Sequence, residues 1–572
     1  MPVPRAWIDR ASVGSWAVPA SLMLVAAVSP FERPIPGSLL GFTLTTLELS
    51  VAAALAAGMF TMGRDPWALR WRSPITIPLA ALLVCALVSS LAAPDFRGNA
   101  LRFTGRCAAA ILLFTLAANG AVSNRLARQI VAVLLGAAAV VGAIAVLELA
   151  QVPAVLDGLK VFRPGFHVVG GQLRATSTLF YPTITSMYLE VVFALGLMWI
   201  HHPTAQSPRG GGPASSRLAF GALALTGAGI VATFTRAGLI TMAISLVTYG
   251  GLVYFKRGSW GREHARLVAL AVILTGLVMV SRSPQMLVSR MSNELSQDWY
   301  GASYDAPAAL TLRPDSFNDV PVTLSNRGWL TWQSAHAPAF ALSYHWLSVD
   351  TEEVVIYDGL RTPFPQPVDP GEEIELQARV RAPGYPGTYL LIWDVVQEHR
   401  TWLSLQGVFP GRTIAKVEGE AVTPPLPTRG RMPSATMRMP RSVLWSTALD
   451  ISRDHPVLGI GPDNYRLTYG KRLGLAAWDA RVHTNNTYLE VLVGMGVIGL
   501  AALTWLVFAG ARATLALISS ATADSVPFVA ATTAACLAIA AHGVVDSFLT
   551  FTSTYVVFAL AAGLHYRHAH RV

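Results

Sequence analysis

The sequence predicts a polytopic α-helical membrane protein of about 12 spans that carries an external β-sandwich insertion. The first observation is composition: 13% of the 572 residues are charged and 53% are hydrophobic, whereas a soluble globular protein carries about 25% charged residues. The second is distribution, because 40 of the 76 charged residues lie between Arg282 and His483. The third is the recurrence of apolar segments near the ~20 residues that a bilayer-crossing helix needs.

Twelve apolar segments are the predicted spans. About nine precede the polar insertion and form the first part of the membrane domain, residues 1–281, and three follow it within 485–572. The first segment follows Arg5 and Arg10, as in a signal peptide, but apolar segments recur towards the C-terminus, so we interpret it as an uncleaved span. The predicted spans lie near residues 15–30, 38–61, 74–93, 104–119, 129–150, 179–201, 217–233, 237–255, 267–281, 487–509, 525–541 and 548–566.

Basic residues predict which side of the membrane each loop occupies. With the N-terminus in the cytoplasm, the cytoplasmic segments carry 16 basic residues and the short external loops carry eight. This orientation places residues 282–483 outside, together with the turns at Arg174, Arg236 and 542–547. Topology thus accounts for the net charge of +10, which therefore does not indicate a nucleic-acid partner.

Arg236 stands out because it lies in ATFTRAGL (232–239), a hairpin with almost no loop. A charge so close to the hydrocarbon boundary is costly unless it is paired or functional, and the alternative is that its side chain snorkels to the interface. The three cysteines lie in or beside apolar stretches without a CxxC pair, and the external loops contain no cluster of metal-ligating residues. We therefore expect no disulfide framework, no metal site and no cofactor.

The polar insertion is predicted to contain a β-sandwich at 318–412, after a connector at 282–317 and before a Pro-rich linker at 413–440. Short segments such as EEIELQARVRAP (372–383) alternate apolar and polar residues and are separated by turns rich in Pro, Gly, Asn and Asp. Its turn and aromatic pattern resembles an immunoglobulin-like accessory module of bacterial envelope proteins. We expect most of its aromatic residues to be core.

Residues 441–484 form a second external segment, predicted to contain loops and helices and to bear a candidate active-site histidine. This segment reads RSVLWSTALDISRDHPVLGIGPDNYRLTYG (441–470), followed by ARVHTNNTYLEVLVGMGVIGLAAL (480–503) across the start of the next span. Together the two blocks resemble the O-antigen ligase and O-antigen polymerase superfamily, which also contains protein O-oligosaccharyltransferases. The matching residues are Trp445, His455, Pro456, Gly459, Gly461, His483, Asn486, Tyr488, Leu489, Gly496 and Gly499, with Tyr465 at a Phe position.

Two upstream blocks extend the resemblance. LRATSTLFYPTITSMYL (173–189) and TFTRAG (233–238) follow the order of the family's arginine motifs and carry Arg174 and Arg236. This sequence departs from those motifs by Ser177 for a glycine, Thr183 for an asparagine and Thr235 for a serine. The resemblance therefore covers most of the membrane part from about residue 170 to 550 and leaves out the β insertion.

The resemblance implies a membrane glycosyltransferase that takes a glycan from a polyprenyl diphosphate and gives it to an acceptor hydroxyl, with inversion. It places the protein in the bacterial cytoplasmic (inner) membrane, with the large loop on the periplasmic side. Arg174 and Arg236 would bind the diphosphate through their planar donor forks, without a metal. His483 would act as general base, or alternatively hydrogen-bond the phosphate.

Four further residues are candidate substrate-binding groups. Asn486 is nearly one helical turn from His483 and would orient it, and Tyr488 follows at the start of the span. His542 and Asp546 lie one turn apart at the last external hairpin and either line the same site or cap a helix. Glu490 is predicted to be a partnered structural carboxylate.

Three function classes remain in competition at this point: a glycan transferase, a polysaccharide transporter and an envelope sensor. The transferase class has three members. A ligase gives the glycan to a lipid acceptor, a polymerase to another lipid-linked repeat, and a protein O-oligosaccharyltransferase to Ser or Thr, and one superfamily pattern serves all three. A polysaccharide transporter with a glycan-binding module, or an envelope sensor, would have no need of His483.

Overall fold

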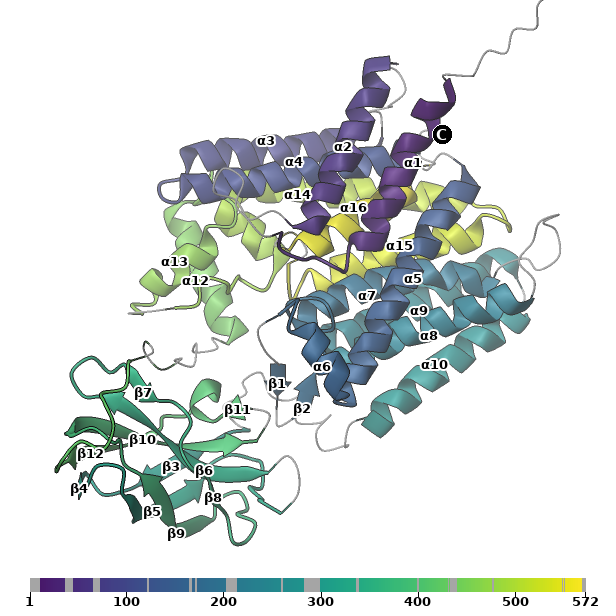
Figure 1. The fold of residues 1–572 in the computed structure, drawn as a ribbon. Coiled ribbons are helices and arrows are strands. Elements are labelled where there is room, and N and C mark those ends of the chain that lie inside the picture. Colours follow the sequence, from purple (N-terminus) through teal and green to yellow (C-terminus); the bar gives the residue numbers. More distant parts are fainter. Residues whose placement is uncertain are drawn as a thin grey trace, which may run out of the picture. The chain divides into compact units, whose positions relative to one another are not determined.

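The structure is a computed structural model of the whole chain, and the helices and strands are labelled in Figure 1. It divides into two compact units, each described here by itself. The helical unit comprises Met1–Gly165, Arg174–Ser283 and Arg441–Val572, and the β-rich unit comprises Phe166–Leu173 and Pro284–Pro440. The structure describes residues 11–35, 45–64, 73–120, 123–163, 167–169, 172–201, 213–258, 261–281, 299–335, 339–398, 401–428, 430, 432, 440–475, 478–547, 549 and 551–567.

Each of the twelve predicted spans overlaps a helix of the helical unit. Two short helices, α12 and α13, lie in the segment between the β-rich unit and α14. The helices are α1 (Ala11–Val28), α2 (Thr46–Arg64), α3 (Thr76–Ala92), α4 (Arg97–Gly120), α5 (Asn124–Leu149), α6 (Pro153–Leu159), α7 (Pro182–Gly196), η1 (Leu197–His201), α8 (Pro213–Thr233), α9 (Arg236–Arg257), α10 (Arg262–Ser281), α12 (Arg441–Asp454), α13 (Tyr465–Arg472), α14 (Thr487–Ser520), α15 (Val526–His542) and α16 (Thr552–Tyr566).

Seven helices within the described ranges are long and apolar enough to cross a membrane. They lie at Arg97–Asn119, Asn124–Leu149, Pro182–Ile200, Ser216–Thr233, Arg236–Arg257, His264–Ser281 and Thr487–Ser520. Four shorter apolar helices lie at Ala17–Val28, Thr46–Thr61, Thr76–Ala92 and Val526–His542. The chain is therefore a polytopic helical membrane protein with a β-sheet insertion, and the total of twelve spans stays a prediction.

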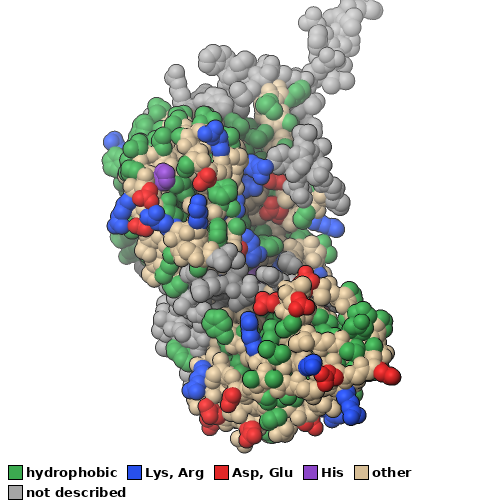
Figure 2. Space-filling view, turned by 90° about the vertical axis from the view of Figure 1, so that its left-hand side faces the viewer, with side chains coloured by type: hydrophobic (Ala, Val, Ile, Leu, Met, Phe, Trp, Pro, Cys, Tyr) green, Lys and Arg blue, Asp and Glu red, His purple; other side chains and the backbone are tan. Residues whose placement is uncertain are grey.

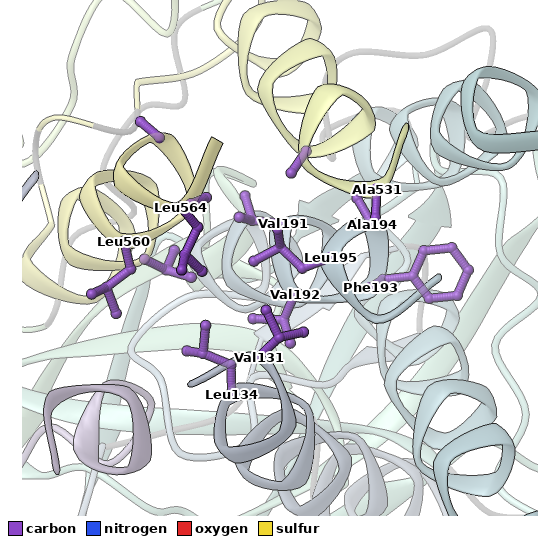
Figure 3. Packing of buried hydrophobic residues seen from close by; sticks show 14 of the residues in the cluster. Val131, Leu134, Val191, Val192, Phe193, Ala194, Leu195, Ala531, Leu560 and Leu564 are labelled. Carbon is purple, nitrogen blue, oxygen red and sulfur yellow. The ribbon is translucent and has the colours of Figure 1, made fainter. Parts of the chain in front are cut away.

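Helix α7 is the centre of the helical unit. Its apolar window is 89% buried, as in a helix that neighbouring helices cover on every side. Figure 3 shows how Val191, Val192 and Leu195 of α7 lie among side chains of α5, α15 and α16. This packing places α7 and the turn before it beside several helix ends, where the candidate site lies.

Two glycines let α5 and α8 cross at close range. A Cβ on Gly142 of α5 would overlap the backbone carbonyl of Leu225, and a Cβ on Gly229 of α8 would lie 2.7 Å from the Gly142 Cα. Membrane helices pack closely where small residues meet, because lipid removes the hydrophobic drive between helices. The α5–α8 contact therefore depends on the missing side chain at Gly142.

We expect Gly142→Ala to destabilise the protein by roughly 1–3 kcal/mol, the usual effect of overpacking. The matched control is Gly136→Ala on the same helix, where an added Cβ meets no atom within 4 Å. Because alanine forms helix about 1 kcal/mol better than glycine, the control should be as stable as wild type or more so. Thermal unfolding in detergent measures both, and equal melting temperatures for the two variants would contradict the crossing.

Besides the β1–β2 pair, the described residues of the β-rich unit form two larger sheets. One has strand order β4-β12-β10-β6-β7, with β11 beside β10 and β8 beside β6, and the other has order β3-β5-β9. Strand β10 pairs antiparallel with β6 and β12, whereas β12 and β4 run parallel. The strands, which include a separate hairpin of β1 and β2, are β1 (His167–Val169), β2 (Gln172–Arg174), β3 (Ala302–Asp305), β4 (Ala309–Leu312), β5 (Phe317–Asn326), β6 (Phe340–Ser348), β7 (Val354–Ile356), β8 (Thr362–Pro363), β9 (Glu373–Arg381), β10 (Gly387–Gln397), β11 (Thr401–Trp402) and β12 (Gly411–Val417).

Aromatic side chains hold the two sheets together. The indole of Trp346 on β6 donates to the Arg381 carbonyl on β9 at 3.0 Å, and the Arg381 amide donates to the Tyr344 hydroxyl at 2.9 Å. Trp346 is fully buried, as are Trp332 and Trp393, so these three aromatics form core as expected. Figure 2 shows charged side chains of both signs on the visible face of this unit.

The β-rich unit extends beyond the predicted sandwich at 318–412. Strands β3 and β4 lie inside the expected connector, 282–317, and β12 runs into the expected linker, 413–440. Strands β3 and β4 have only four residues each, which is too few for an alternation pattern to be recognised. The immunoglobulin-like assignment stays a prediction.

Candidate functional site

The two motif blocks join through a break in helix α14. Gly496 adopts φ 64 and ψ −166 inside this helix, so the carbonyls of the preceding residues lose their helical donors. The amides of Ile460 and Gly461 supply replacements, donating to the Val493 and Gly494 carbonyls at 3.0 and 2.9 Å. A Cβ on Gly496 would overlap the Val457 carbonyl, and so this position needs glycine for both its φ angle and its close packing.

His483 lies directly before α14, in a buried turn. Its side chain is 7% exposed, and its ring faces Phe551 at 6.4 Å between centroids. The indole of Trp445 on α12 donates to the Thr484 carbonyl at 3.0 Å, and the hydroxyl of Tyr465 donates to the Leu444 carbonyl at 2.8 Å. Aromatic residues of the first block thus hold α12 in place beside the turn that carries the histidine.

Two buried carboxylates face the Nδ1 atom of His483. The distances are 3.7 Å to Oδ1 of Asp463 and 3.8 Å to Oε1 of Glu490, which are ion-pair rather than hydrogen-bond distances. Burial of the imidazole lowers the pKa of His483, but the carboxylates of Glu490 and then Asp463 raise it by more. The pKa of His483 therefore lies above its ordinary value.

Asn486 and Tyr488 connect α14 to the end of α15. The Asn486 side chain caps α14 by accepting from the amides of Tyr488 and Leu489 at 2.9 and 3.0 Å. Its Nδ2 donates to the Val544 carbonyl at 2.9 Å, and the Tyr488 hydroxyl donates to the Ala540 carbonyl at 3.1 Å. These bonds give both residues structural roles, and substrate binding by them stays a prediction.

His542 and Asp546 lie on the other side of this junction. His542 ends α15, is 1% exposed and places Nδ1 at 2.7 Å from Oε1 of Glu190 on α7. The Asp546 amide donates to the His542 carbonyl, and the Asp546 carbonyl accepts from the Thr487 hydroxyl at 2.9 Å. Glu190, for which the sequence indicated no role, is thus the partner of His542.

Arg174 and Arg236 meet at the turn between α8 and α9. The Arg174 guanidinium donates from Nε to the Thr233 carbonyl and from Nη2 to the Thr235 hydroxyl, both at 3.0 Å. Arg236 follows Thr235 directly as the first residue of α9. Both arginine side chains are half-buried, so neither guanidinium lies deep in the apolar core.

A buried ion pair shapes the segment that carries Arg174. Glu148 of α5 is fully buried and lies 2.5 Å from the guanidinium of Arg163. Its carboxylate also accepts from the Thr176 amide at 3.1 Å and the Ser177 amide at 2.7 Å. Ser177 stands at φ 50, where the family motif has glycine, and these bonds to Glu148 stabilise the turn.

A chain of contacts joins the arginine turn to the histidine turn. Glu190 of α7 binds His542 and also accepts from the Thr241 hydroxyl of α9, the helix that begins at Arg236. The loop after His542 in turn binds the first residues of α14, because the Thr487 amide donates to the Gly543 carbonyl at 2.7 Å. These contacts link the element that begins at Arg236 to the start of α14 through α7 and α15, all within the helical unit.

Sequence reasoning missed Asp463, together with the two residues that hold it. Asn99 of α4 and Arg466 of α13 both donate to the Asp463 carboxylate, at 3.1 and 3.0 Å. The sequence signal was the PDN run between Gly461 and Tyr465, which indicates a turn but gives no hint of a histidine partner. Within the described part of the chain, no group of three or more His, Cys, Asp or Glu side chains is placed to hold a metal ion.

The apolar helices and the β-sheet insertion define the class, a multi-pass helical membrane protein, and the candidate residues lie in the turns that join its helices. A family model described as O-antigen ligase matches residues 403–504. This match supports a relationship to the O-antigen ligase and polymerase superfamily and indicates a membrane enzyme of that type. The match begins in the last part of the β-rich unit and includes His483, Asp463 and Glu490. No curated protein matches the chain.

Proposed function

We propose that the protein transfers a glycan from a polyprenyl-diphosphate donor to an acceptor hydroxyl, in the manner of an O-antigen ligase. The observation that carries this proposal is the buried His483, which turns Nδ1 towards two carboxylates and belongs to the segment that matches the family. The reaction takes place at the outer face of the bacterial cytoplasmic membrane, with residues 282–483 on the periplasmic side.

The proposed reaction is a single displacement at the anomeric carbon. The acceptor oxygen bonds to that carbon as the bond from the carbon to the diphosphate oxygen breaks, and the configuration inverts. His483 accepts the hydroxyl proton as general base. The electron pair of the broken bond leaves with the polyprenyl diphosphate, whose charge Arg174 and Arg236 stabilise.

Two observations support these residue roles. A general base needs a pKa near the working pH, and the two carboxylates raise the pKa of His483 from its ordinary value. A diphosphate clamp needs preorganised donors, and the bonds from Arg174 to Thr233 and Thr235 hold its guanidinium against the turn that directly precedes Arg236. Because guanidinium groups supply the positive charge, the reaction does not require a metal.

Purified protein in detergent tests this function by the release of polyprenyl diphosphate from a lipid-linked glycan in the presence of EDTA. We expect release when the right acceptor is present: a lipid A-core for a ligase, a second lipid-linked repeat for a polymerase, or a Ser- or Thr-containing peptide for a protein glycosyltransferase. Release that stops in EDTA and returns with a divalent cation would contradict the metal-independent mechanism. Glycan movement across vesicles without diphosphate release would favour a transporter.

A further inference from the structure

The two carboxylates that face His483 share one arrangement. In Glu490, Oε2 accepts from the amide and the hydroxyl of Thr484 at 3.0 and 2.9 Å, while Oε1 points to Nδ1. In Asp463, Oδ2 accepts from Arg466 and Asn99, while Oδ1 points to Nδ1. In each carboxylate one oxygen is anchored and the other is aimed at the same nitrogen.

Both ends of the Glu490 contact are buried, and among the described contacts neither Nδ1 of His483 nor Oε1 of Glu490 has a hydrogen-bond partner. A lone pair on Nδ1 would face two negative oxygens, which is repulsive, whereas a proton on Nδ1 would be attracted to both. The neutral imidazole therefore carries its hydrogen on Nδ1 and leaves the Nε2 lone pair for the substrate.

The backbone conformation at Asp463 does not by itself require a carboxylate. Asp463 adopts φ 65, a left-handed conformation that glycine adopts freely and that few other residues adopt. Gly459 and Gly461, in the same turn, also have positive φ. A third glycine would suit the backbone here, but it would leave Nδ1 facing one carboxylate.

We propose that Asp463 and Glu490 are paired positioning residues that hold His483 with its proton on Nδ1, so that Nε2 is the atom that takes the acceptor proton. This inference rests on the proposed transferase function. After proton transfer the imidazolium lies between two anions, which stabilise the new positive charge. Asn99 extends the arrangement to α4, so the orientation of the base is tied to a helix that precedes it by hundreds of residues.

The other charges that face His483 do not replace this pair. Arg466 lies beside Asp463 at 2.9 Å and opposes the effect of the carboxylates on the pKa of His483. Asp479, which precedes His483 in the same loop, is paired with Arg481 at 2.8 Å, although its own pKa also responds to the charge of His483. Phe551, at the start of α16, contributes an uncharged ring.

The test compares Asp463→Asn, Glu490→Gln and the double variant with Asp450→Asn. Asparagine tolerates the left-handed conformation, so Asp463→Asn removes the charge and keeps the backbone. The side chain of Asp450 on α12 is 46% exposed and pairs with Arg472 at 2.8 Å, so its variant removes an equal charge away from the histidine. Asp463→Gly adds a variant that relieves the backbone strain but also removes the bonds to Arg466 and Asn99, and it should titrate like Asp463→Asn.

Two readouts separate positioning from folding. The first is the titration of His483, followed by NMR of carbon-13-labelled histidine in the detergent-solubilised protein and assigned with His483→Gln. The second is the pH dependence of polyprenyl diphosphate release. We expect the His483 titration and the acid limb of kcat to move to lower pH in Asp463→Asn and Glu490→Gln, with kcat lower by ~10–100-fold. Asp450→Asn should match wild type in both.

The outcomes distinguish this inference from the proposed function. If the wild type releases no diphosphate but the titration moves as expected, the transferase proposal fails while the placement of the carboxylates holds. If the wild type is active and the carboxylate variants keep the wild-type titration and acid limb, the positioning role is overturned. If Asp463→Asn melts at a much lower temperature than Asp463→Gly, its changed titration reflects a folding defect. The titration of His483 in Asp463→Gly then tests the positioning role.

Discussion

Replacing His483 with alanine should lower the rate of polyprenyl diphosphate release by about 10²–10⁴-fold, the usual contribution of a general base. The residue is 7% exposed, so the substitution leaves a small buried space rather than a surface change. Glu490 would then lose the ring that it faces, whereas Asp463 would keep its ion pair with Arg466. The measurement is kcat for release, with thermal unfolding to show that the variant is folded.

His455→Ala is the matched control, because His455 is the histidine of the other motif block and its side chain is exposed. We expect wild-type rates from it. For the wild type we also expect activity to fall as the pH drops through the pKa of His483, since a protonated imidazole accepts no proton. Because that pKa is raised, the acid limb should lie above the ordinary histidine value of about 6.5. Release undiminished in His483→Ala would overturn the mechanism.

The helices of the membrane part were predictable because apolar segments of sufficient length leave few alternatives to a membrane span. The ends of these helices were less predictable. Helix α14 runs to Ser520, beyond the expected end at residue 509, and bends at Gly496. The bend is possible because the Ile460 and Gly461 amides donate to carbonyls that lose their helical donors. Hydropathy along the chain does not predict such a tertiary contact.

The candidate site was predictable for side chains that are unusual where they stand. Arg236 is a charge in a nearly loopless hairpin, and His483 lies in a block that resembles a known family. Asp463 is an ordinary turn residue in sequence, and its importance appears only when the fold brings Asn99 to it across 364 positions. Glu190 is an acid within the predicted span 179–201, but its partner His542 lies 352 positions away.

Arginine at positions 174 and 236 should be needed for its planar fork as well as its charge. We expect Arg174→Ala and Arg236→Ala each to lower release by about 10²–10³-fold, as when one preorganised donor to a developing negative charge is removed. The lysine variants should recover only part of this loss, because an ammonium group keeps the charge but cannot bind two phosphate oxygens in one plane. Arg33→Ala is the control, an exposed arginine on the same predicted side of the membrane.

The two kinds of variant should separate binding from proton transfer. Pyrophosphate is a simple probe of the clamp, and its inhibition of release should weaken by at least ~10-fold in the lysine variants, since each loses a bidentate contact. The same probe should bind His483→Ala as tightly as wild type if the histidine acts on the acceptor. Weaker binding to His483→Ala would instead assign the imidazole to the phosphate, the alternative that the sequence left open. Undiminished inhibition in both lysine variants would place the diphosphate away from the α8–α9 turn, because Arg174 and Arg236 are joined there through Thr235.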